Sequence, residues 1–180
     1  QMNPSPKNKF ADSRIRRAGE FVNRKLARAG RVCYNEEETK GAGNMNREIV
    51  RDVLFLSRKS APATRGDAAL AKDLQDTLIA NRDRCAGLAA NMIGQAKRVI
   101  AFDCFGTPRV MLNPVITEKK GVYEAEESCL SLSGARKTTR YREIEVQYQD
   151  VNLNPHAERF TGWLAQVIQH ECDHLEGILI

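Results

Sequence analysis

The stretch that decides the fold is Gln169-His170-Glu171-Cys172-Asp173-His174-Leu175-Glu176-Gly177, close to the end of the sequence. His170 and His174 are four residues apart, so on a helix they share one face and both imidazoles can reach a single metal ion. Glu171 follows the first histidine and can act as the base for a metal-bound water, as in the H-E-x-x-H metallohydrolases. The stretch therefore predicts a helix with two metal ligands and a catalytic carboxylate; a helix with ordinary surface histidines is the alternative.

The third metal ligand has to come from elsewhere in the sequence or from within the motif. Cys172 stands about 200° around the helix from His170, so it points away from the metal-binding face. His156 is isolated in a turn, where a histidine is more often a surface residue than a ligand. Cys129 stands among small residues in a turn-like run. The full set of candidates is Cys33, Cys85, Cys104, Cys129, Cys172 and His156.

Three stretches, taken in chain order, resemble the peptide deformylases: Gly87-Leu88-Ala89-Ala90, Glu127-Ser128-Cys129-Leu130-Ser131 and Gln169-His170-Glu171-Cys172-Asp173-His174. The resemblance covers roughly residues 45–180. Three motifs in the same order are far more specific than one short motif. The resemblance implies a metal-dependent hydrolase that removes the N-formyl group from the formylmethionine of nascent polypeptides.

The resemblance also implies roles for individual residues. Cys129, His170 and His174 would bind one divalent metal ion, with water in the fourth position, and Glu171 would be the general base. The backbone N–H of Leu130 would donate to the oxygen of the tetrahedral intermediate. The native metal would be Fe²⁺, with Zn²⁺, Ni²⁺ or Co²⁺ as alternatives, because the ligand spacing does not distinguish these ions.

Several residues of the expected substrate site differ from the family pattern. Met92 stands where the family has a glutamine that donates to the intermediate, and a thioether donates no hydrogen bond. Trp163 and Gln166 precede His170 by seven and four residues, on the same helix face, where the family presents apolar residues to the substrate's methionine side chain. We hypothesise that Gln166 partly replaces the missing amide or admits a more polar substrate.

Gly87 and Arg136 are also expected near the substrate. Gly87 lets the backbone come close to a ligand, because it has no side chain. Arg136 matches an arginine that the family carries near the bound peptide, with a solvated surface role as the alternative. Cys85 and Ser128 stand where the family usually has glycine.

Composition is ordinary for a globular protein: 180 residues with 42% hydrophobic and 28% charged residues predict one domain with a real core. We expect no membrane span, because no run of eighteen apolar residues occurs. We also expect no secretory signal. Five cysteines without regular spacing argue against a disulfide framework, and a reducing cytoplasm suits them.

The net charge of +5 is concentrated in residues 1–44, which hold ten Lys or Arg and five Asp or Glu, whereas residues 45–180 hold eighteen of each. Residues 1–44 are predicted to be an N-terminal extension: a disordered arm, a basic helix over residues 12–30 and a glycine-rich joint. The helix is interpreted as a solvated docking helix, with contact to ribosomal RNA or a targeting segment as alternatives. Residues 45–180 are predicted to be the catalytic domain.

The periodicity of residues 45–180 predicts an α+β fold in which antiparallel strands surround a central metal-binding helix. Leu70, Leu74 and Leu78 fall four apart and predict a core helix over residues 67–81. Strands are expected at residues 98–103, 110–112, 143–148 and 158–161. Residues 115–118 and 122–126 flank Lys119-Lys120-Gly121 and predict a hairpin. A helix is predicted to start at Thr161 or Gly162 and to stop at Gly177.

Two rival functions remain open at the level of the sequence. The first is an amidase for another N-acyl substrate, which the residues at positions 92, 163 and 166 suggest. The second is a deformylase-like protein that binds metal or nascent chains with little or no turnover. The presence of Glu171 with all three expected ligands counts against this second rival. The oligomeric state is not predicted.

Overall fold

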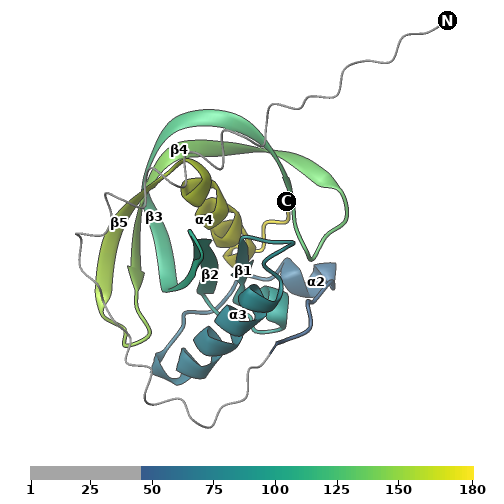
Figure 1. Cartoon of the computed structure of the whole chain (residues 1–180), viewed down its shortest axis with the longest axis vertical. Helices are drawn as coiled ribbons and strands as arrows, with labels where there is room; N and C mark the ends of the chain where they lie inside the picture. The colour runs from purple at the N-terminus through teal and green to yellow at the C-terminus, as the bar shows by residue number, and fades with distance from the viewer. Residues whose placement is uncertain (1–45) are drawn as a thin grey trace, which may run out of the picture. The chain divides into compact units, whose positions relative to one another are not determined.

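The computed structural model describes residues 46–180 (Figure 1). The predicted N-terminal extension, with its basic helix and Cys33, therefore lies outside the described residues. Over residues 46–180 the fold is α+β, as the sequence predicts, with one antiparallel sheet and helices packed on it.

The sheet has five strands in the order β1-β2-β3-β4-β5, so every strand pairs with its neighbour in the sequence. All four pairings are antiparallel. Alternation explains why β4 forms: Ile144, Val146 and Tyr148 face the core, whereas the residues between them are more exposed. The strands are β1 (Gly87–Ala89), β2 (Val99–Cys104), β3 (Thr107–Ser128), β4 (Ala135–Gln149) and β5 (Pro155–Thr161).

The hairpin predicted around Lys119-Lys120-Gly121 is wrong, because β3 runs through this segment as one strand of 22 residues. Lys120 pairs with Glu143 and Val122 pairs with Tyr141, so β4 accompanies β3 on both sides of the glycine. Gly121 has a φ of +70° without turning the chain. Pro114 lies within the first of two shifts of register, between Leu112 and Val115, where a missing N–H is tolerated.

The core helix is α3 (Ala68–Ala80), which matches the helix predicted from leucine spacing. Leu74 and Leu78 are fully buried, and Leu70 is half-buried beside them. Helix α3 packs against β2, so its apolar stripe covers the side of the sheet that carries the core. Three shorter helical segments connect the main elements: α2 (Val53–Leu56), η2 (Arg65–Asp67) and η3 (Ala90–Ile93).

The last helix, α4 (Gly162–Leu175), lies near the middle of the domain, and the long strands β3 and β4 arch over it (Figure 1). It ends where the sequence predicts. Gly177 has a φ of +73°, and a Cβ there would lie 2.2 Å from the carbonyl oxygen of Ser57. The buried Asn91 amide donates to the carbonyl oxygen of His174, at 2.8 Å. The position of the helix is therefore fixed at its carboxyl end by contacts from α2 and η3.

Within residues 46–180, no helix combines the length and the apolar character needed to cross a membrane.

Candidate active site

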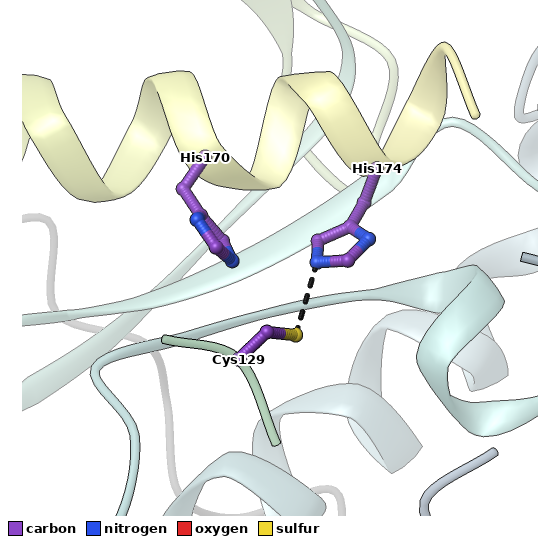
Figure 2. A group of neighbouring side chains, drawn as sticks. All are labelled: Cys129, His170 and His174. Carbon is purple, nitrogen blue, oxygen red and sulfur yellow. Dashed lines mark hydrogen bonds between the residues drawn. The ribbon is translucent and has the colours of Figure 1, made fainter. Parts of the chain in front are cut away.

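Three side chains that the sequence analysis proposed as ligands meet beside α4. His170 and His174 come from successive turns of the helix, and Cys129 follows directly after the end of β3 (Figure 2). The Cys129 sulfur and one nitrogen from each imidazole all lie within 4.8 Å of one another. Cys129 Sγ is 3.2 Å from His174 Nε2. A thiol and two imidazoles at this separation can hold one divalent cation and leave a position open.

The other described cysteines do not join this group. Burial raises the pKa of Cys85 to about 12, with the charge of Glu171 adding to the effect. Burial likewise raises the pKa of Cys172 to about 12. Among the described residues, only Cys129 joins His170 and His174 in a group whose ligand atoms lie within 4.8 Å of one another, so Cys85, Cys104 and Cys172 are not part of it. His156 is also remote from the site, since it contacts Asp150 and stacks on Tyr148.

The orientation of His170 is set by the buried carboxylate of Glu127. His170 Nδ1 lies 2.8 Å from Glu127 Oε2, so Nδ1 carries the proton and donates it to the carboxylate. Nε2 is thereby left as the nitrogen available to a metal. Burial alone would raise the pKa of Glu127, but hydrogen bonds from His170 and Arg140 outweigh burial and lower it to about 2. Glu127 is therefore ionised at physiological pH, and it contacts His170, one of the expected ligands.

The Glu127 charge is balanced by Arg140, whose side chain is also buried. Arg140 Nε and one terminal nitrogen donate to the two oxygens of Glu127 at 2.9 and 2.8 Å. The other terminal nitrogen donates to Asp173 at 2.6 Å. The guanidinium thus connects β4 to the end of β3 and to α4.

His174 sits in a different environment from His170. It is almost fully buried, and its Nδ1 has no hydrogen-bond partner. Burial lowers its pKa to about 3, and the positive charges of His170 and Arg140 add to the effect. The imidazole is therefore neutral at physiological pH, which is the form that binds a metal. The residues present thus fit a metal ion. His174 is neutral, Glu127 accepts the Nδ1 proton of His170, and Cys129 supplies a thiol.

Glu171 is buried beside the cluster and faces the strand β1. Burial raises the pKa of Glu171 to about 7, close to neutrality. Its Oε2 has no hydrogen-bond partner. A carboxyl group in this state can both take up and release a proton near pH 7. Its position depends on Gly87, because a Cβ there would lie 2.5 Å from Glu171 Oε1.

A cavity of about 520 Å³ opens onto this cluster. One wall comes from residues just before and within β1, another from the end of β3, and a third from α4. Four of the five expected substrate-binding residues line it, together with Leu130 and Glu171. The lining residues that the sequence singled out are Cys85, Gly87, Met92, Ser128, Cys129, Leu130, Trp163, Gln166, His170 and Glu171. The fifth, Arg136, is exposed, does not line the cavity, and has its guanidinium 3.4 Å from the carbonyl oxygen of Ser133.

The polar atoms of Gln166 are engaged within the protein. Its Nε2 donates to Glu127 at 2.9 Å, and its Oε1 accepts from the Tyr123 hydroxyl at 2.9 Å. Gln166 therefore does not offer its amide in place of the glutamine that Met92 replaces. The thioether of Met92 also contacts the protein itself, because its sulfur accepts from the backbone N–H of Ala89 at 3.5 Å.

Two residues of the site were missed by sequence reasoning. Glu127 was read only as part of a motif, and Tyr123 only as part of a strand. Both act through partners about forty residues away in the sequence. No local periodicity signals such a contact, although the acidic residue two before Cys129 could have suggested a partner for a ligand histidine.

Comparison with known proteins identifies the family of this chain. A sequence model of polypeptide deformylase matches residues 47–180. The chain belongs to the polypeptide deformylase family. This confirms the resemblance drawn from the three motifs, and with it the prediction of an enzyme that removes N-formyl groups from nascent peptides. It also confirms the coarser prediction of a metal-dependent enzyme.

Individual relatives agree with the family match. A peptide deformylase of Clostridium beijerinckii is 54% identical over 136 residues, which cover 76% of this chain and 100% of the relative. Peptide deformylase 1 of Clostridium perfringens is 41% identical over 113 residues, or 61% of this chain and 76% of the relative. The crystal structure of a Legionella pneumophila peptide deformylase superposes with a TM-score of 0.68 at 32% identity, covering 74% and 82% of the two chains.

The contact between Gly87 and Glu171 generates a prediction. A Gly87→Ala variant should displace Glu171, because the added Cβ would also lie 2.8 Å from a Val167 methyl group. A displacement of about 1 Å near reacting groups can cost on the order of 10²-fold in rate, so we expect formate release from a formyl-Met peptide to fall by about that factor. Gly66→Ala is the control, since a Cβ there meets only Thr64 Oγ1, at 3.7 Å. Equal activity of the two variants would show that the close approach is not needed.

Proposed function

We propose that this chain deformylates formylmethionine peptides at the cavity, with Cys129, His170 and His174 as metal ligands and Glu171 as the general base. The observation that carries the proposal is the meeting of the three ligand atoms within 4.8 Å, beside a buried carboxyl group whose pKa is raised to about 7. Residues 45–180 are the catalytic domain in this proposal.

The donor set, one thiolate and two imidazoles, suits a divalent metal ion. Fe²⁺ is the metal that we propose natively, with Zn²⁺, Ni²⁺ or Co²⁺ able to occupy the same ligands. When bound, such an ion polarises a carbonyl oxygen and acidifies a water. The protein's part is to direct the ligand nitrogens: Glu127 fixes the proton of His170 on Nδ1, and burial keeps His174 neutral.

Glu171 moves the proton in this proposal. As a carboxylate it takes a proton from the attacking water, and as a carboxylic acid it returns that proton to the amine that leaves. Both halves of the cycle need a pKa near the working pH, and burial provides it. The unpartnered Oε2 is free to serve as the proton-carrying atom.

The negative oxygen of the tetrahedral intermediate needs a hydrogen-bond donor. We assign this role to the backbone N–H of Leu130, because Leu130 follows Cys129 directly and lines the same cavity. Met92 offers no donor on the other side, and its sulfur accepts from Ala89. The site therefore works with one protein donor where the family pattern has two.

One part of the cavity wall suits an apolar side chain such as that of methionine. Met92, Trp163 and Val167 line it, and the polar atoms of Gln166 are turned toward Glu127 and Tyr123. What Gln166 presents to a substrate is largely its aliphatic stem. This arrangement favours formylmethionine over a polar N-acyl substrate, and the complete set of ligands with Glu171 favours turnover over simple binding.

A glutamine at position 171 tests the proton-transfer role. Glu171→Gln keeps the shape of the side chain but holds no exchangeable carboxyl proton, so kcat should fall by about 10²- to 10⁴-fold. Formate release from a formyl-Met tripeptide measures this, with the metal content of both proteins confirmed at about one ion per chain. A variant that keeps wild-type kcat would refute the role of Glu171.

The single-donor arrangement yields a second prediction. Met92→Gln should restore an amide donor beside the intermediate and raise kcat, by up to about 10²-fold, with a smaller effect on KM. Met92→Leu is the matched control, because it changes the thioether to a hydrocarbon and adds no donor. If Met92→Gln and Met92→Leu change kcat alike, the missing donor does not limit the rate.

We further propose that residues 1–44 bring the cytoplasmic enzyme to the ribosome, where its formylated substrate emerges. Their ten basic residues against five acidic ones would bind phosphates without sequence readout. The full chain should therefore co-sediment with ribosomes at low salt and dissociate at high salt, whereas residues 45–180 alone should not bind at either. Equal sedimentation of the two proteins would contradict this partner.

A further inference from the structure

The side chain of Gln166 bridges Tyr123 and Glu127, the carboxylate that contacts the expected metal ligand His170. Tyr123 lies on β3, Gln166 on α4, and Glu127 at the end of β3. Because a carboxylate accepts hydrogen bonds and donates none, the Gln166 atom that faces Glu127 has to be the amide nitrogen. The oxygen then faces Tyr123, so the phenol donates to it. The direction of each hydrogen bond is thus fixed by chemistry.

Glu127 receives four donors, which is as many as a carboxylate has lone-pair sites. On Oε1 these are Arg140 Nε at 2.9 Å and Gln166 Nε2 at 2.9 Å. On Oε2 they are an Arg140 terminal nitrogen at 2.8 Å and His170 Nδ1 at 2.8 Å. An apolar residue at position 166, as the family pattern has, would supply only three. Gln166 therefore completes the shell of an anion whose side chain is 7% exposed.

We propose that Gln166 is a positioning residue for the metal site: it holds the Glu127 carboxylate in the orientation that directs His170 Nε2 toward Cys129 and His174, and Tyr123 holds Gln166. This inference rests on the metal site of the proposed function. It concerns the affinity and geometry of that site and not the identity of the substrate.

The physical reason is the cost of leaving a buried carboxylate oxygen without one of its donors. With leucine at position 166, Oε1 of Glu127 would face a hydrocarbon on one side. The carboxylate would turn toward the cavity to find water, and the bond to His170 would lose its alignment. Removing a direct partner of a metal-bound histidine typically costs 10- to 100-fold in metal affinity. Gln166 acts one bond further away, so we expect roughly a three- to tenfold loss.

The test compares Gln166→Leu and Tyr123→Phe with the wild-type chain. Both variants should bind Co²⁺ more weakly in competition with a chelator, with Tyr123→Phe the milder of the two because Gln166 Nε2 can still reach Glu127. The visible absorption bands of bound Co²⁺ should shift in both, since they depend on ligand geometry. Thermal melting of each protein checks that the fold is retained, and Tyr123→Phe, which loses one hydroxyl, keeps the test usable if Gln166→Leu misfolds.

Two matched controls separate the chain of hydrogen bonds from its surroundings. Trp163→Leu alters the same helix face and the same cavity without touching Glu127, so its Co²⁺ affinity and spectrum should equal those of the wild type. Thr139→Val removes a different hydroxyl from the β3–β4 pair, where Thr139 donates to Glu124 at 2.9 Å, and should also have no effect.

The outcomes separate this inference from the proposed function. If Gln166→Leu and Tyr123→Phe bind Co²⁺ within twofold of the wild type and give the same spectrum, Gln166 only lines the cavity and the inference is overturned. The positioning role of Gln166 would then be refuted even if the wild-type protein releases formate. If the wild type releases no formate but the variants lose Co²⁺ affinity, the positioning role holds and the proposed substrate fails.

Discussion

The buried ion pair between Glu127 and Arg140 is the interaction on which the site depends. Their side chains are 7% and 4% exposed, and the pair joins the end of β3 to β4. Arg140 also contacts Asp173, and Glu127 contacts His170, so each member of the pair has a partner on α4. Removing one partner of such a pair typically costs about 3–5 kcal/mol, because the other charge is left buried and unpaired. The three elements that build the metal centre are therefore connected through one pair of charges.

The length of β3 explains how a strand and a helix come to share this centre. Because β3 continues past Gly121 without a turn, it brings Glu127 to α4. Cys129 follows the end of the strand and lies beside the helix (Figure 2). Glu127 is buried behind His170, and Cys129 comes two residues later, near His174. The two residues thus reach different sides of the same cluster. A hairpin at Lys119–Gly121 would have ended the strand before it reached the helix.

The opposite wall of the cavity is set by close backbone approach. The short strand β1 brings Gly87 so near to α4 that no side chain fits between them. Glu171 is excluded from water there, and its pKa rises for that reason. The close packing that holds the Glu171 carboxyl group in place also excludes water from it, and this raises its pKa. The position of the carboxyl group and its raised pKa therefore have one physical cause at this wall, the close packing of Gly87, which has no side chain, on the helix.

Two replacements relative to the family pattern, Met92 and Gln166, have different effects in this structure. Met92 removes a donor from the cavity and turns its sulfur to its own backbone. Gln166 adds a polar group at an apolar position, yet its polar atoms are hydrogen-bonded to Tyr123 and Glu127. A substitution that looks like a change of substrate in the sequence is, in three dimensions, a contact behind the metal site.

The sequence by itself predicted the two long helices, the family and the grouping of Cys129 with His170 and His174. The spacing of His170 and His174 and the leucine stripe of α3 are local periodicities, and a helix translates them directly into one face. Only the tertiary structure decided the path of β3, the orientation of Gln166 and the role of Glu127. Each of these depends on a partner between 13 and 43 residues away, such as Arg140 and His170 for Glu127. Local patterns carry no information about which distant side chain will satisfy a buried polar group, whereas burial makes that partner obligatory.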